Sequence, residues 1–171
     1  MSVGAVVLAA GSATRFGAPK QQILLDEVLA RVRRAATIDE VVVVAGAHPV
    51  ETDAFVVECP EWERGVGASL RCGLRSLSDD AEAAVVVLSD GPDIAPAALD
   101  RVVAAWRAGA GDVLAATYGG ARSHPVLLAR KIWDRVPDEG ARALEPVLVR
   151  CDDLVDPGDV DRPEDLPSRL R

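Results

Sequence analysis

The sequence predicts an α/β fold: a three-layer sandwich around a mostly parallel, Rossmann-like sheet. Residues 41–45 and 84–88 are continuous runs of alanine, valine and leucine, as expected for parallel strands that are buried on both faces. Such runs alternate along the chain with stretches of helical periodicity, and this alternation favours right-handed crossovers. The 171 residues contain no internal repeat or linker, so we expect one domain over residues 1–171.

The first 108 residues supply three of the expected helices. An apolar run at residues 3–7 predicts the first strand. Residues 24–35 then place their apolar side chains at spacings of three and four, as one face of a helix requires. Further helices are expected at residues 66–77 and 96–108, and the second of these opens with a proline in its first turn.

The second half is expected to be less regular. Residues 113–118 and 125–128 predict two strands that pair antiparallel across a Gly-Gly turn. Short helices are expected at residues 131–136 and 141–149, each limited by a proline. Residues 162–166 predict the beginning of another helix.

The composition narrows the class of protein and its partners. A net charge of −8 and a pI near 4.8 argue against nucleic-acid binding, which needs a basic surface. No apolar run approaches the ~20 residues that cross a bilayer, and no signal peptide is visible before the first strand. The three cysteines, Cys59, Cys72 and Cys151, lack metal-ligand spacing and are expected to be reduced thiols. We therefore expect a cytoplasmic protein that binds neither membrane nor nucleic acid.

A glycine-bearing loop follows the first strand and indicates phosphate binding. Residues 8–21 read Leu-Ala-Ala-Gly-Ser-Ala-Thr-Arg-Phe-Gly-Ala-Pro-Lys-Gln. Gly11 and Gly17 allow the backbone N–H groups to approach a ligand, and Arg15 and Lys20 bring positive charge to phosphate oxygens. The order of residues fits neither a Walker loop nor a dinucleotide-binding fingerprint. An ordinary turn is the alternative interpretation.

Lys20 stands out because the chain has 19 basic residues and only two lysines, the other being Lys131. A lysine kept in this loop indicates a site that requires a compact point charge, although chance placement would also explain it. Pro19 directly precedes Lys20, fixes its approach and argues against a helix that begins at once.

Asp90 follows the 84–88 strand within an Asp-Gly-Pro sequence. Taken alone, this sequence is typical of a turn. Open α/β sheets, however, bind ligands at the carboxyl ends of their strands. Together with the loop at residues 8–21, a carboxylate in this place indicates a ligand for Mg²⁺ beside a polyphosphate.

The 8–21 segment resembles the signature of the MobA-like NTP transferase family, most closely that of the molybdenum cofactor cytidylyltransferases. The resemblance implies a sheet of the nucleotide-diphospho-sugar transferase type. It also implies that Lys20 and Arg15 act on the phosphates during catalysis. The residues implied to bind the nucleotide are Leu8, Ala9, Ala10, Gly11, Gly17 and Ser69.

Residues 159–166 are similar to the family's closing Asp-Ile-Asp-Thr-Pro-Glu-Asp pattern. An alternating pair in an extended segment places Asp159 and Asp161 on the same side. The resemblance implies that Asp161, with Asp159, completes the magnesium site opposite Asp90; a solvated helix cap is the alternative. The chain departs from the family pattern at Gly91, where Gln is usual, and at Arg162, where Thr is more common.

Three further segments match the family. Residues 62–74 resemble the segment that frames base and sugar, where Ser69 either binds the base or caps a helix. Residues 120–126 and 140–144 resemble segments on the acceptor side, with an arginine of the latter meeting the acceptor's phosphate. A purely structural role for His124, which lies in the first of these two, is the alternative.

The resemblance implies a nucleotidyltransferase that moves CMP from CTP to a phosphorylated pterin-type acceptor such as molybdopterin, with Mg²⁺ as cofactor. A molybdoenzyme is the further partner that it suggests. Ala10 points to a pyrimidine nucleotide, because the guanylyl branch usually has glycine there. Residues 46–62 leave no room for a full helix, and a hairpin usual after Gln21 is missing. Two alternatives to this function are therefore open. The protein transfers the nucleotide to a different phosphorylated acceptor, such as a sugar phosphate, or it is a non-catalytic molybdenum-cofactor chaperone.

Overall fold

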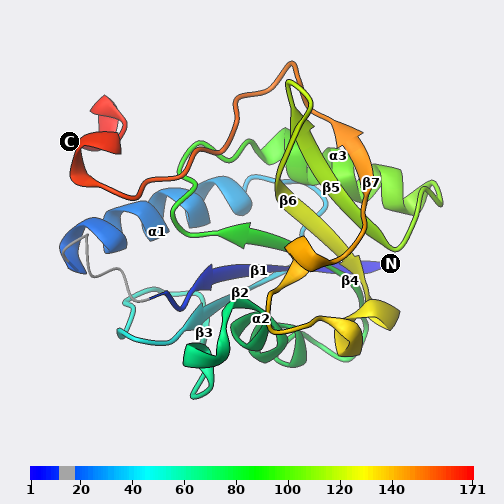
Figure 1. The fold of residues 1–171 in the computed structure, drawn as a ribbon, viewed down its shortest axis with the longest axis horizontal. Coiled ribbons are helices and arrows are strands. Elements are labelled where there is room, and N and C mark those ends of the chain that lie inside the picture. The colour runs from blue at the N-terminus through cyan, green and yellow to red at the C-terminus, as the bar shows by residue number, and fades with distance from the viewer. Residues whose placement is uncertain (12–17) are drawn as a thin grey trace.

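The computed structural model describes residues 1–11 and 18–171, with side chains described from residue 21 onward in the second range. It confirms the predicted fold class: a seven-stranded sheet with the order β3-β2-β1-β4-β6-β5-β7 (Figure 1). Only β6 runs antiparallel to its neighbours, β4 and β5; the other pairs are parallel. The strands are β1 (Ser2–Ala9), β2 (Glu40–Ala45), β3 (Phe55–Glu58), β4 (Ala81–Leu88), β5 (Val113–Tyr118), β6 (Ala121–Ala129) and β7 (Val147–Arg150).

Helices cover both faces of the sheet (Figure 1). The helices α1 (Ala18–Val32) and α3 (Pro96–Arg107) pack on one face, and α2 (Val66–Arg75) packs on the other. Strand β1 contributes to both layers because its side chains alternate: Val7 joins the first core cluster and Val6 the second. Both side chains are completely buried, which explains why the central strands read as unbroken apolar runs.

The start of α1 corrects one expectation. The helix begins at Ala18, so Pro19 lies in its first turn instead of delaying it. A proline is well tolerated there because the first amide groups of a helix have no intrahelical acceptor. The backbone at Lys20 is therefore helical, whereas its side chain, Arg15 and Gly17 lie outside the described residues.

The region after β6 corrects a second expectation. Residues 130–135 form a 3-10 helix, Arg130–Arg135, but the helix expected at 141–149 is only a short 3-10 turn, Ala141–Ala143. The chain then enters β7, which pairs with β5 in parallel. A proline at position 146 ends helical structure, and the following Val-Leu-Val is well suited to an edge strand.

The connection between β2 and α2 contains two features that the sequence did not reveal. Strand β3 extends the sheet without any helix between it and β2, which agrees with the short spacing of residues 46–62. A disulfide joins Cys59, just after β3, to Cys72 on α2, and Cys151 is a buried free thiol. The prediction of three reduced thiols is therefore wrong for two of them, because only the pairing of β3 with β2 brings these cysteines together.

The remaining helical segments are single turns. The segment expected to open a helix at residues 162–166 forms a 3-10 turn, Pro163–Asp165, followed by another, Ser168–Leu170. Among the described helices, none combines the length and hydrophobicity that crossing a bilayer requires.

Candidate active site

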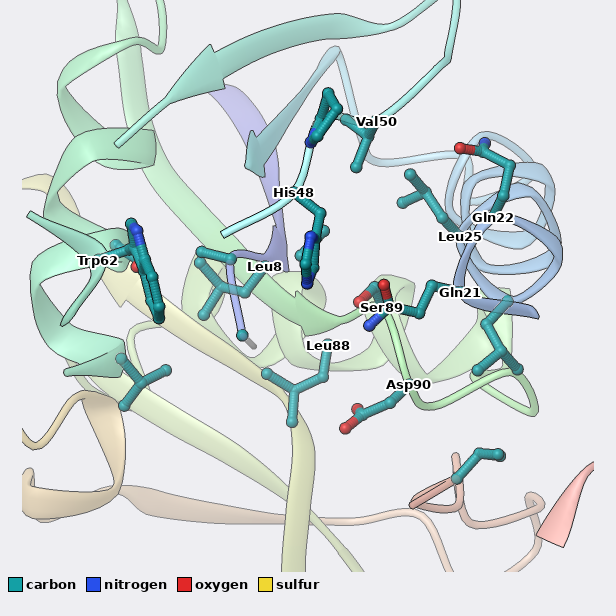
Figure 2. Close-up of a pocket in the computed structure, with 18 of the residues that line it drawn as sticks. Leu8, Gln21, Gln22, Leu25, His48, Val50, Trp62, Leu88, Ser89 and Asp90 are labelled. Carbon is teal, nitrogen blue, oxygen red and sulfur yellow. The ribbon is translucent and has the colours of Figure 1, made fainter. Parts of the chain in front are cut away.

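A cavity of about 630 Å³ opens at the carboxyl ends of β1, β2 and β4 (Figure 2). Its walls come from the end of β1, the first turns of α1, the loop after β2, the start of α2 and the residues after β4. This volume lies in the range typical of small-molecule sites. The sheet determines the location, because parallel strands end at the same edge.

Most of the predicted binding residues that the structure describes line this cavity. They come from four separate parts of the chain, which the fold brings together: Leu8, Ala9, Ala10, Gly11, Ser69, Asp90 and Asp161. Asp159 lies beside the cavity within the acidic cluster described below. For Arg15, Gly17 and the side chain of Lys20, which lie outside the described residues, the predicted roles remain predictions.

One wall of the cavity is largely apolar. Trp62 and Leu8 lie on this side in Figure 2. Trp62 packs tightly against Gly46, where an added Cβ would lie 2.8 Å from the Cβ of Trp62 and 2.7 Å from the carbonyl oxygen of Ala10. The absence of a side chain at Gly46 therefore lets the tryptophan approach the end of β1. An apolar surface with a large ring is suited to the flat face of an organic ligand.

Residues 136–138 hold the start of α2 in place. The amide of Gly67 donates to the carbonyl oxygen of Asp138 at 2.9 Å, and an added Cβ would lie 1.7 Å from the carbonyl oxygen of Pro137. Arg71 donates to the carbonyl oxygen of Val136 at 2.7 Å and pairs with the Asp138 carboxylate. The Arg71 side chain is only 16% exposed and is held by these contacts instead of being solvated. Only the tertiary fold supplies its partners.

The loop after β2 contributes His48, which the sequence analysis did not single out. His48 and Val50 reach toward the middle of the cavity (Figure 2). Gln22 of α1 fixes this loop, because its side-chain amide donates to the carbonyl oxygen of Glu51 at 2.6 Å and accepts from the Glu51 amide at 3.1 Å. Nothing in the local sequence marks these residues; their proximity depends on the short loop and on the position of α1.

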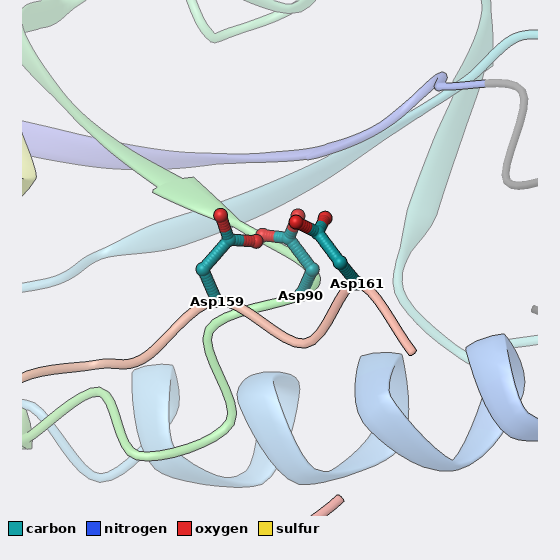
Figure 3. A group of neighbouring side chains, drawn as sticks. All are labelled: Asp90, Asp159 and Asp161. Atoms are coloured by element: carbon teal, nitrogen blue, oxygen red, sulfur yellow. The ribbon is translucent and has the colours of Figure 1, made fainter. Parts of the chain in front are cut away.

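Three carboxylates gather at the other end of the cavity (Figure 3). One oxygen from each of Asp90, Asp159 and Asp161 lies within 4.8 Å of the others. Asp90 follows β4 and is partly buried, whereas the other two are exposed on the extended segment that passes it. The amide of Val160 donates to the carbonyl oxygen of Asp90 at 2.9 Å, which directs both neighbouring aspartates to the same side.

The electrostatics of Asp90 are unusual for an aspartate. Its Oδ1 atom is buried and has no hydrogen-bond partner among the described residues. Burial, followed by the charge of Asp159, a hydrogen bond with Asp159 and the charge of Asp161, raises the pKa of Asp90 to about 7. Unpaired buried oxygen and mutually repelling carboxylates are costly unless a cation neutralises them. Oxygen donors of this kind suit a hard divalent cation.

The predicted acceptor-side residues lie elsewhere. His124 is part of β6, its carbonyl oxygen accepts from the Tyr118 hydroxyl at 2.9 Å, and burial lowers its pKa to about 4. It does not line the cavity described above. Arg142 is also outside the lining, and its carbonyl oxygen accepts from Arg122 at 3.4 Å. These positions favour the structural interpretation of His124.

The seven-stranded sheet with its order β3-β2-β1-β4-β6-β5-β7 has the fold of solved nucleotidyltransferase structures. The family follows from the sequence: residues 5–152 match the MobA-like NTP transferase domain. The chain belongs to the MobA-like NTP transferase family. A search of curated proteins gives no match.

Solved mycobacterial structures share the fold over nearly the whole chain. Rv0371c from Mycobacterium tuberculosis H37Rv is 28% identical with a TM-score of 0.74, and the match covers 96% of each chain. A homologue of it from Mycobacterium sp. strain JC1 is 28% identical with a TM-score of 0.78, over 95% of this chain and 92% of that one. A manganese complex of Rv0371c, 24% identical over 96% of each chain, has a TM-score of 0.70.

Proposed function

We propose that this protein transfers CMP from CTP to a phosphorylated, pterin-type small molecule and releases pyrophosphate. The observation that carries the proposal is the acidic cluster of Asp90, Asp159 and Asp161 at the edge of a cavity whose other walls include residues 8–11 and Ser69. The cavity has an apolar wall and an acidic end, and a nucleotide would fit it with its base against the wall and its phosphates toward the carboxylates. The family, which consists of NTP transferase domains, supports the reaction class.

The carboxylates fit a divalent cation. Among the residues that the structure describes, the buried Oδ1 of Asp90 accepts no hydrogen bond and is free to bind a cation, and two exposed aspartates face it. The related protein Rv0371c was solved in complex with manganese, which supports a divalent cation such as Mg²⁺ or Mn²⁺ for this protein. When bound, such a cation would supply positive charge that offsets the charge of the phosphates. Asp90, Asp159 and Asp161 would hold it.

The chemistry requires alignment more than proton transfer. An oxygen of the acceptor's phosphate attacks the α-phosphorus of the nucleotide, and the bond to pyrophosphate breaks with its electron pair. The second pKa of a phosphate monoester is about 6, so the attacking oxygen is already ionised at neutral pH and no general base is needed. The chain's contribution would be to orient the nucleotide through residues 8–11 and Ser69. Arg15 and Lys20 would stabilise the phosphates.

The proposed nucleotide is CTP and the proposed acceptor is molybdopterin. Ala10 supports a pyrimidine nucleotide through the family resemblance, and a molybdoenzyme would receive the product in the cytoplasm. The direct passage from β2 to β3 shortens the wall that contains His48. This shortening is the observation that favours the alternatives, either a different phosphorylated acceptor or a non-catalytic cofactor chaperone.

The test is pyrophosphate release from CTP, UTP, GTP and ATP, each with Mg²⁺ or Mn²⁺ and a panel of phosphorylated acceptors. We expect turnover to depend on the cation and CTP to exceed GTP. Asp161→Asn should abolish most of the turnover. Glu164→Gln, which removes an exposed carboxylate three residues further along, is the matched control and should retain it. Cation-dependent nucleotide binding without pyrophosphate release would instead indicate the chaperone, and a preference for GTP would contradict the cytidylyl assignment.

A further inference from the structure

We propose that Arg169 is a positioning residue for the metal site, because it anchors the segment that carries Asp159 and Asp161. This inference rests on the proposed function. Both aspartates lie on the 156–171 segment. Their position opposite Asp90 therefore depends on the contacts that hold this segment against the rest of the chain.

The first set of contacts joins this segment to the loop after β4. The amide of Val160 donates to the carbonyl oxygen of Asp90 at 2.9 Å, and the amide of Asp93 donates to the carbonyl oxygen of Pro157 at 3.0 Å. These two bonds run between the same two stretches of chain in opposite directions. They determine the register that places Asp159 and Asp161 at Asp90.

The second set is a small apolar cluster against α1. Val160, located between the two aspartates, is 7% exposed and packs with Leu24 and Leu166, each 4% exposed. Figure 1 shows the end of this segment beside the first turns of α1. Because side chains alternate in an extended segment, burial of Val160 turns the aspartates on either side toward the cavity. Three apolar side chains form a much smaller core than either layer of the sheet.

Arg169 provides the third and most extensive link. Its Nη2 atom lies 2.6 Å from the Asp93 carboxylate, 3.5 Å from that of Glu27 on α1, and 3.3 Å from the carbonyl oxygen of Pro92. Glu27 also pairs with Arg31 at 2.8 Å. One guanidinium therefore connects the segment both to α1 and to the loop that begins at Asp90. Charge-assisted bonds of this kind restrict geometry more than neutral ones.

The expected consequence is on cation affinity. Without the guanidinium, the 156–171 segment would sample positions in which its aspartates no longer face Asp90, and forming the site would require ordering it again. Partners that orient metal ligands typically contribute 10–100-fold in affinity, so Arg169→Ala should weaken Mn²⁺ binding by roughly that factor. Arg33→Ala is the matched control, because the Arg33 side chain is also 42% exposed and ion-paired, to Asp53.

The experiment measures Mn²⁺ binding calorimetrically on the whole, nucleotide-free protein. Asp93→Ala should reproduce the loss, and combining it with Arg169→Ala should add little, because both changes break the same link. Hydrogen exchange on the metal-free variant should show faster exchange at the Val160 amide with unchanged protection in β1 and β4. That pattern separates release of the segment from general unfolding.

Four possible results distinguish these interpretations. Equal Mn²⁺ affinity for Arg169→Ala and Arg33→Ala would overturn the inference, and so would fully additive losses with Asp93→Ala. A wild-type protein that binds no Mn²⁺ would overturn both this inference and the proposed metal site. If wild-type protein binds Mn²⁺ and Arg169→Ala weakens it, but no acceptor yields pyrophosphate, the positioning role is supported and only the proposed function fails.

Discussion

Replacing Asp90 by asparagine should stabilise the metal-free protein at pH 8 although it removes a proposed metal ligand. The pKa of Asp90 is raised to about 7 by burial and by the neighbouring carboxylates, from an ordinary value of 3.8. The folded chain therefore binds more protons than the unfolded chain between these values. Because of this difference in bound protons, Asp90 lowers the free energy of unfolding progressively as the pH rises from about 4 to 7.

The difference between the two pKa values of Asp90 sets the size of this change in the free energy of unfolding. One pKa unit corresponds to 1.36 kcal/mol, so the ionised carboxylate costs up to about 4 kcal/mol at pH 8. Asparagine has nearly the same shape as aspartate and no charge. Its buried side-chain amide would lack some hydrogen-bond partners, which reduces the gain. We therefore expect a gain of roughly 2–3 kcal/mol, or about 5–10 °C in Tm for a chain of this length.

The assay is thermal unfolding in chelator at pH 8 and pH 5. The gain should be large at pH 8 and small at pH 5, where the wild-type carboxyl is protonated. Asp159→Asn and Asp161→Asn, which remove only the neighbouring charges, should give smaller gains, in that order. Excess Mn²⁺ should raise the Tm of wild type but not of Asp90→Asn. A Tm difference that is equal at both pH values, or a destabilised variant at pH 8, would refute the reasoning.

Other predictions concern the rest of the molecule. Lys20→Ala should remove nucleotide-dependent turnover without lowering Tm; pyrophosphate release at the wild-type rate would contradict its role. Asp90→Asn and Asp161→Asn should each abolish most activity, and the double variant should be scarcely worse, because either change empties one site; multiplied losses in steady-state rates would exclude a shared cation. Reducing the Cys59–Cys72 bond, which closes a loop over a sequence separation of 13, should cost about 3 kcal/mol in urea unfolding; Cys72→Ser should then no longer respond to reductant. Burial lowers the pKa of His124 to about 4, so the free energy of unfolding should be highest above pH 6.5 and fall as the pH decreases toward 4. Urea unfolding of the Asp90→Asn variant should show this decline, and a free energy of unfolding that does not change with pH would disprove it.

Much of the site could be located from the sequence because its residues follow strand ends. The run at residues 3–7 predicted β1, and the residues directly after it, Ala10 and Gly11, line the cavity. Asp90 follows β4 and lines the same cavity for the same reason. Periodicity reports burial, and in a parallel sheet burial identifies the strands whose carboxyl ends gather at one edge.

Two errors came from reading local signals without their surroundings. Pro19 was taken to delay a helix that in fact begins at Ala18, since a first-turn position accepts proline. A helix was expected at residues 141–149, but its last part belongs to β7 because the open edge of β5 is available to pair with it. Short segments with mixed propensity are decided by the neighbours they meet.

The sequence by itself predicted the fold class and the strand ends at which residues 8–11 and Asp90 lie, because these depend on patterns of burial. Asp159 and Asp161 came from the resemblance to the family. The tertiary structure alone decided which distant groups meet. It joined Cys59 to Cys72, placed His48 and Trp62 around one cavity, and held the 156–171 segment to α1 through Arg169. Such contacts depend on how loops and edge elements pack in space, and the spacing of residues along a chain does not encode those distances.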